Sequence, residues 1–259
     1  MKKLVFAAVF LAPVMLFGQS AFDGTWVFSP QSAQFAGKPI TILLQNNVYQ
    51  CDSCVPKIKA QADGKDHERK GSPYSDTVSV RVIDDNTTEV VTKKGGKVVG
   101  TTKDLVSADG KTMTSEWSFV ADNGQPGNGK TVSKRVADSA AGAHKVSGSW
   151  QPEKMEDASE SVLKVTFKAT EDGLSMSDLT GDSYTAKFDG KDYPYKGDPG
   201  ITSVSLKKID ANTIEETDKR AGKAILISRM TVSADGKTLT VENNDKLRST
   251  SSKFEGKKE

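Results

Sequence analysis

Histidine and cysteine are nearly absent from the chain, which contains only two residues of each kind. His67 and His144 do not stand at a recognisable catalytic spacing, so a histidine-based catalytic triad is not expected. A structural zinc ion needs four ligands, and this small supply does not suggest a site for one. The 36 basic and 34 acidic residues nearly cancel and are dispersed, so no basic surface for nucleic acid is expected.

Long apolar runs are also absent, except at the N-terminus. Met1-Lys2-Lys3 precedes an uncharged run from Leu4 to Phe17, and the small and polar Gly18-Gln19-Ser20 follow. This order is typical of a secretory signal peptide, and the run is too short to span a bilayer. We therefore expect a signal peptide at residues 1–20, cleavage before Ala21, no membrane span, and a secreted or periplasmic mature protein.

The chain contains an internal repeat. Asp63 to Glu116 aligns without a gap with Asp189 to Glu242, and close to half of the aligned positions are identical. Upstream of each segment stands the same short pattern, Gly24-x-Trp26 in the first copy and Gly148-x-Trp150 in the second. A repeat of this length indicates a duplicated domain rather than solenoid units. The sequence predicts two tandem domains, residues 21–137 and 146–259, joined by a small, polar linker at 138–145.

Each copy reads as a series of short strands. Thr77 to Val82 and Leu163 to Lys168 alternate apolar and polar residues, as half-buried antiparallel strands do. Asp109-Gly110 and Asp235-Gly236 stand between such runs and indicate tight hairpin turns. The prediction is an all-β protein with two antiparallel up-and-down β-barrels, with a two-sheet sandwich as the alternative.

A strand carrying Gly-x-Trp followed by a meander resembles the calycin superfamily of lipocalin-like, fatty-acid-binding and avidin-like barrels. In lipocalins the tryptophan closes one barrel end under a basic residue of the last strand. The resemblance implies such a role for Trp26 in the first copy, with Arg135 as its basic residue, and for Trp150 in the second copy, with Lys253. It also implies a cavity for a small apolar ligand, for which the aromatic candidates are Phe167, Phe188, Trp117 and Phe119.

Residues Gly124 to Thr131 satisfy the phosphate-binding pattern Gly-x-x-x-x-Gly-Lys-Thr. That pattern binds phosphate only where a strand enters the loop and a helix leaves it. Here the following residues, Val132 to Val136, are strand-like. A glycine-rich hairpin loop is the better interpretation, and no nucleotide or other cofactor is expected.

Cys51 and Cys54 have the spacing of thioredoxin-like redox sites, which lie at the start of a helix. This pair instead follows a strand-like segment and precedes Val55-Pro56. A static disulfide that closes a tight loop is therefore favoured over a redox role.

Three functions remain open. The leading hypothesis is a non-catalytic module that binds a small apolar molecule in one or both barrels. The alternative is a structural or envelope-associated protein that acts through its surface. A carboxylate-based hydrolase is the third, because Asp84 and Glu89 recur as Asp210 and Glu215, although turn formation explains these aspartates more simply.

Overall fold

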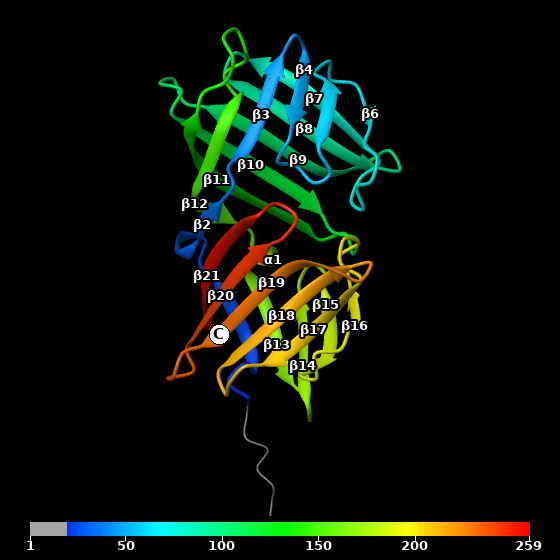
Figure 1. The fold of residues 1–259 in the computed structure, drawn as a ribbon, viewed down its shortest axis with the longest axis vertical. Coiled ribbons are helices and arrows are strands. Elements are labelled where there is room, and N and C mark those ends of the chain that lie inside the picture. Colours follow the sequence, from blue (N-terminus) through cyan, green and yellow to red (C-terminus); the bar gives the residue numbers. More distant parts are fainter. Residues whose placement is uncertain (1–19) are drawn as a thin grey trace, which may run out of the picture.

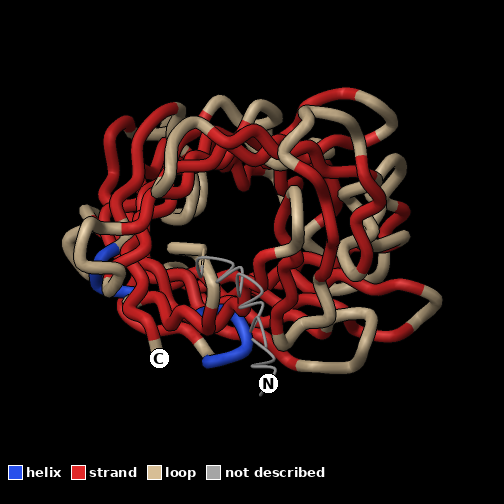
Figure 2. Tube along the Cα trace, turned by 90° about the horizontal axis from the view of Figure 1, so that it is seen from below, coloured by secondary structure: helices blue, strands red, loops and turns tan. Residues whose placement is uncertain are grey.

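The computed structural model describes residues 20–259, so the expected signal peptide, apart from Ser20, lies outside the described residues. Two antiparallel β-barrels lie one above the other along the long axis of the molecule (Figure 1). Viewed along that axis, the strands form a ring (Figure 2). The predicted all-β fold with two barrels is therefore confirmed. No helix in the described part of the chain is long and apolar enough to cross a membrane.

Barrel 1 is a ten-stranded sheet in the spatial order β5-β4-β3-β12-β11-β10-β9-β8-β7-β6. The segment after β5 pairs with β7, where the Gly64 amide donates to the Val80 carbonyl at 2.9 Å and Asp63 forms an isolated bridge with Arg81. Its strands are β3 (Ile40–Gln45), β4 (Val48–Cys51), β5 (Ile58–Gln61), β6 (His67–Glu68), β7 (Thr77–Asp84), β8 (Thr87–Lys94), β9 (Lys97–Val106), β10 (Thr112–Val120), β11 (Pro126–Ala137) and β12 (Gly148–Ala158).

Barrel 2 is formed by an eleven-stranded sheet that closes through the pairing of β1 with β21. The short strand β2 (Gln34–Gly37) pairs with β21 from outside the ring. The ring strands are β1 (Gly24–Phe28), β13 (Lys164–Ala169), β14 (Gly173–Asp178), β15 (Ser183–Lys187), β16 (Tyr193–Lys196), β17 (Ser203–Lys208), β18 (Thr213–Arg220), β19 (Lys223–Val232), β20 (Thr238–Asp245) and β21 (Thr250–Lys258).

The two Gly-x-Trp strands are exchanged between the barrels. Strand β1, which carries Trp26, lies between β13 and β21 of barrel 2. Strand β12, which carries Trp150, lies between β11 and β3 of barrel 1. Each barrel therefore takes its Gly-x-Trp strand from the other sequence repeat.

The strand pairing consequently crosses the domain boundaries expected at 21–137 and 146–259. Barrel 1 is one continuous segment from β3 to β12, whereas barrel 2 combines β1 with β13 to β21. Residues 138–145, expected as the linker, connect β11 to β12 within barrel 1, where the His144 amide donates to the Leu44 carbonyl at 2.9 Å. The chain passes between the barrels at residues 38–39 and through the short helix α1 (Glu160–Leu163).

The Asp-Gly turns form as expected. Gly110 and Gly236 adopt φ values of 71° and 72°, which glycine reaches at little cost. The Asp109 carboxylate accepts the Lys111 amide at 3.0 Å, and Asp235 accepts the Lys237 amide at 3.1 Å. These matched bonds explain why this turn sequence is the same in both repeats.

Each barrel has its own hydrophobic core. In barrel 1 the buried cluster includes Val80, Val106 and Trp150, and in barrel 2 it includes Trp26 and Leu206. All five side chains are at most 1% exposed. The cores share no residue, so the loss of a core side chain should affect chiefly the barrel that contains it.

The predicted disulfide between Cys51 and Cys54 is confirmed. Cys51 belongs to the core cluster of barrel 1, and Cys54 packs against that cluster. Because the closed loop is very short, we expect reduction to lower the unfolding free energy of barrel 1 by less than the roughly 3 kcal/mol of a 15-residue loop. Urea unfolding with and without reductant measures this difference. A larger loss, or an equal loss in barrel 2, would contradict the expectation.

Candidate functional site

Trp150 closes one end of barrel 1. Its indole Nε1 donates to the Val146 carbonyl at 2.8 Å, and its side chain is fully buried. The Arg135 guanidinium lies 4.0 Å from the centre of the indole ring and donates to the carbonyls of Gly110, Ser147 and Lys145. The basic residue from the first repeat therefore covers the tryptophan of the second repeat, because strand β12 is exchanged.

Trp26 closes barrel 2 in the same manner. Its Nε1 donates to the Phe22 carbonyl at 2.9 Å, and the Lys258 ammonium lies 5.2 Å from its ring centre. Lys253, which was expected to cover Trp150 within the second repeat, lies instead opposite Gln34 and Glu242 on strand β21. The type of closure was anticipated, whereas both basic partners were assigned incorrectly: Arg135 covers Trp150, and Lys258 covers Trp26.

The interior of barrel 1 contains a cavity of about 470 Å³. Ile42, Ile58, Val90 and Met113 provide apolar walls, and Trp117 lies at the same cavity. Because Thr92 and Gly100 line both this cavity and a cleft against barrel 2, the open end of barrel 1 faces barrel 2. The rest of the lining includes hydroxyl and charged side chains, and a concave space that combines apolar walls with polar groups is the usual form of a small-molecule site.

Besides Arg69, the cavity is lined by one other charged residue, Asp104. It is 4% exposed and accepts a hydrogen bond from the Ser115 hydroxyl at 2.5 Å. Burial raises the pKa of Asp104 to about 6. The nearby Tyr49 is also buried, and burial together with the Asp104 charge raises the pKa of its hydroxyl. Near neutral pH the cavity therefore presents a phenol and a carboxyl group that titrates in the physiological range.

Sequence reasoning missed Asp104, although a signal for it was present. Val106 is buried, and Asp104 and Thr102 precede it at every second position of β9. Since alternate residues of a strand share a face, this spacing directs Asp104 inward. The predicted ligand site included only aromatic side chains, so the inward-facing carboxylate on this strand was not predicted.

Trp117 and Phe119 lie on β10 near the open end, with ring centres 6.4 Å apart and planes 12° apart. Their cross-strand partners are Gly129 and Gly127. A Cβ atom at either glycine would collide with the opposite aromatic ring. Gly127 and Gly129, both within the segment from Gly124 to Thr131, thus leave room for two aromatic rings to lie across β11.

No strand-to-helix phosphate loop forms at this motif. Pro126 to Ala137 are a strand, as expected for a hairpin, and the Lys130 ammonium is 3.0 Å from the Glu116 carboxylate. Three of the four matched acids have structural partners: Glu89 pairs with Arg81 at 2.8 Å, and Asp84 and Asp210 accept turn amides.

Phe167 and Phe188 lie in barrel 2 and do not line the cavity of barrel 1. Phe167 is 4% exposed and contacts Phe22 edge to face at 6.4 Å, and Phe188 packs against the same core. The structure therefore separates the four aromatic candidates, placing Trp117 and Phe119 at cavity walls and the other two in packed protein.

A buried acidic pair occupies the interior of barrel 2. Glu216 accepts a hydrogen bond from the Tyr184 hydroxyl, and Asp218 is two residues further along β18. Burial raises the pKa of both carboxyl groups. At these aligned positions barrel 1 has Val90 and Thr92, so the two interiors differ in chemistry despite their common fold.

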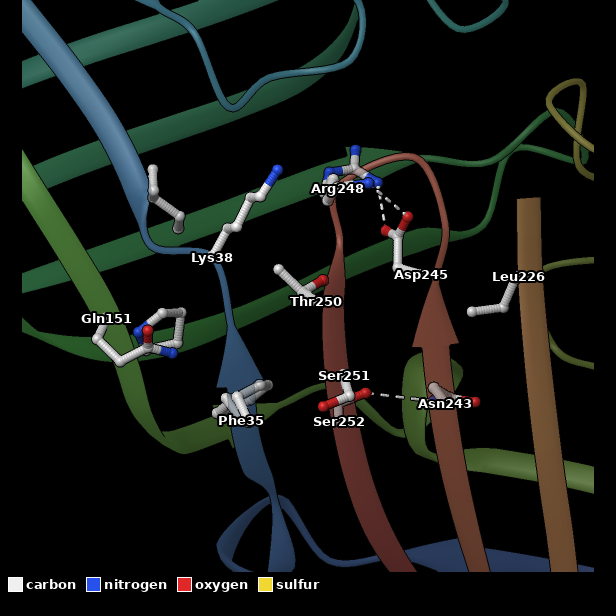
Figure 3. A pocket seen from close by; sticks show the side chains of 13 residues that line it. Phe35, Lys38, Gln151, Leu226, Asn243, Asp245, Arg248, Thr250, Ser251 and Ser252 are labelled. Carbon is white, nitrogen blue, oxygen red and sulfur yellow. Dashed lines mark hydrogen bonds and ion pairs between the residues drawn. The ribbon is translucent and has the colours of Figure 1, made fainter.

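A further groove, of about 310 Å³, lies at the junction where β2 runs along β21 (Figure 3). Arg248 pairs with Asp245 at 2.9 Å there, and Asn243 donates to Ser252 at 3.4 Å. These polar groups are satisfied by one another, so the groove is a weaker ligand site than the cavity of barrel 1.

Comparison with protein-family models, with curated proteins and with solved structures finds no match in any of the three.

Proposed function

We propose that this protein is an exported, non-catalytic binding protein that holds a small, largely apolar molecule in barrel 1. The cavity of about 470 Å³ carries the proposal. The calycin resemblance, the Cys51–Cys54 disulfide and the N-terminal sequence support it. Barrel 2 is the structural partner, since Phe167 and its neighbours fill its core.

The expected affinity follows from the apolar walls. Burial of apolar surface contributes about 25 cal/mol per Å², so about 300 Å² of ligand surface supplies roughly 7.5 kcal/mol before the costs of association. Such a ligand binds in the micromolar range at best without a charged anchor. A function through the surface alone is the alternative, and a hydrolase is less supported, because Glu216 and Asp218 are buried in the core.

Trp117 provides an internal reporter. Of the three tryptophans, Trp26 and Trp150 are fully buried at the closed ends, whereas Trp117 lies at the cavity. We expect a hydrophobic dye such as anilinonaphthalene sulfonate to bind the mature protein and quench Trp117. Thr102→Phe, which places a ring in the cavity, should weaken binding at least about tenfold, because the ligand and the ring compete for space.

Lys103→Phe is the matched control, because it adds the same ring to the exposed face of the same strand. Its dye affinity should equal that of the wild type. Equal affinity of both variants and the wild type, with all three folded, would show that the dye binds elsewhere and would favour the surface function.

A further inference from the structure

The cavity of barrel 1 is lined by an arginine that has no acidic partner. Arg69 belongs to the cavity wall and makes no ion pair within residues 20–259. Its Nη1 atom donates to the Ser75 hydroxyl at 3.0 Å, whereas its buried Nε atom has no hydrogen-bond partner among the same residues. A buried donor without an acceptor is costly, so an acceptor brought by a ligand would be favourable here. Barrel 2 has Tyr195 at the aligned position, so the fold does not require an arginine.

Asp104, the other charged residue of the cavity wall, is well separated from Arg69 along the barrel. Asp104 lies opposite Thr88, near the start of β8. The Arg69 amide donates to the Asp76 carbonyl, and the Asp76 amide donates to the Lys93 carbonyl near the other end of β8. Thr88 and Lys93 are five positions apart on this strand, which corresponds to about 16 Å. The cavity therefore has a basic group toward one end and an acidic group toward the other.

The second repeat shows that the fold does not require the acidic group either. In the alignment of the repeats, Asp104 and Ser115 correspond to Met230 and Val241. The members of each pair lie opposite each other on neighbouring strands. The hydrogen-bonded pair of barrel 1 is thus an apolar pair in barrel 2. A barrel of this kind forms without a charge at this position, so the carboxylate of barrel 1 is available for a ligand.

From this arrangement we infer that barrel 1 binds an elongated amphiphilic acid that carries a hydrogen-bond donor, such as a hydroxyl group, at its far end. This inference rests on the proposed function of the barrel 1 cavity and names the class of ligand. The carboxylate of the ligand pairs with the Nε edge of Arg69, because two parallel N–H groups match the two oxygens of a carboxylate. The hydroxyl donates to Asp104, which has a pKa of about 6 and is charged at pH 7.5. The apolar chain between them contacts Val90 and Met113.

The position of the open end fixes the direction of the ligand. Thr92 lines both the cavity and the cleft against barrel 2, and it stands beside Lys93 at the Arg69 end of β8. The acid group therefore lies at the mouth of the cavity, and the chain extends inward to Asp104. A fully apolar ligand fits less well, because it would remove both charged groups from water without supplying a hydrogen bond.

The test compares three probes of equal chain length on the full mature protein at pH 7.5, below their aggregation concentrations, by the change in Trp117 emission. Methyl dodecanoate carries neither group, dodecanoate carries the acid alone, and ω-hydroxydodecanoate carries both. We expect dodecanoate to bind at least about ten times more tightly than its methyl ester, and the hydroxy acid at least about five times more tightly than dodecanoate.

Two variants locate these effects. Arg69→Gln should bring the affinities for dodecanoate and its methyl ester close together. Asp104→Met combined with Ser115→Val copies the apolar pair of barrel 2 and should remove the advantage of the hydroxy acid. Arg81→Gln is the matched control, because Arg81 is exposed on the outside of barrel 1 and pairs with Glu89. It should keep both affinity ratios of the wild type.

The outcomes separate the inference from the proposed function. Equal binding of dodecanoate and its methyl ester by the wild type, or equal ratios in Arg69→Gln and Arg81→Gln, would refute the acid site while the apolar cavity stands. Equal binding of the hydroxy acid and dodecanoate would refute the two-ended ligand. If none of the probes binds, the proposed function fails together with the inference. The wild-type comparison needs no variant, so it decides the question even where a variant does not fold.

Discussion

Trp26→Ala is expected to destabilise barrel 2 by about 3–5 kcal/mol, the usual cost of removing a buried tryptophan, and to leave barrel 1 folded. Trp26 lies in the first repeat of the sequence, but strand β1 completes the barrel built from the second repeat. Hydrogen exchange followed by mass spectrometry should show lost protection in β13 and β21, with unchanged protection in β3 to β11.

Trp150→Ala is the reciprocal control, because Trp150 is equally buried at the closed end of barrel 1. It should remove protection from β3 and β11 and spare barrel 2. If Trp26→Ala instead exposes barrel 1, each repeat forms its own barrel and the strand exchange is wrong.

The exchange of the two Gly-x-Trp strands explains why the internal repeat predicted the fold of each domain correctly but the boundaries between the domains incorrectly. The two Gly-x-Trp strands are so alike that each meets the same kind of core and the same kind of basic residue in either barrel. The hydrophobic pattern and the turn residues are therefore compatible with two strand pairings, one in which each Gly-x-Trp strand joins the barrel of its own repeat and one in which it joins the other barrel. The arrangement has the topology of a strand-swapped dimer of single barrels within one chain.

The connecting segments distinguish the two pairings in the structure. After β1 the chain continues into β2, which pairs with β21 of barrel 2 before it enters barrel 1. The Ser29 amide also donates to the Glu255 carbonyl at 3.0 Å. These are contacts between residues more than two hundred positions apart, which no local sequence signal specifies.

The candidate site depends on differences between repeats that are otherwise closely similar. At the inward positions, Val90, Gly100 and Trp117 of barrel 1 align with Glu216, Leu226 and Asn243 of barrel 2. Strand alternation predicts which positions face inward, and the repeat alignment then predicts which interior is apolar. The volume of the cavity could not be predicted, because it depends on how rings such as Trp117 lie across Gly129.

The stability of barrel 2 is expected to fall as the pH rises from about 4 to 8. Burial holds the pKa of Glu216 and Asp218 above the values near 4 of unfolded chains. Below pH 4 both groups are protonated in the folded and unfolded states, so burial then carries no ionisation cost. As the pH rises, the unfolded chain releases these protons first, and the folded state loses relative stability until its own raised pKa values are passed.

Asp218→Asn should therefore stabilise barrel 2 at pH 8, by about 1–3 kcal/mol, and flatten its pH dependence, because the amide stays neutral and can donate a hydrogen bond. The neighbours that face this group are Glu216, Asp182, Asp198 and Tyr195, none of which supplies a compensating positive charge. Urea unfolding at pH 5 and pH 8, resolved by hydrogen exchange in β18, measures both effects.

Asp104→Asn is the matched control, since the pKa of about 6 for Asp104 predicts the same sign of change in stability, in barrel 1 alone. A variant Asp218→Asn that is less stable than the wild type at pH 8 would contradict the prediction and show that the buried carboxylate stabilises the barrel.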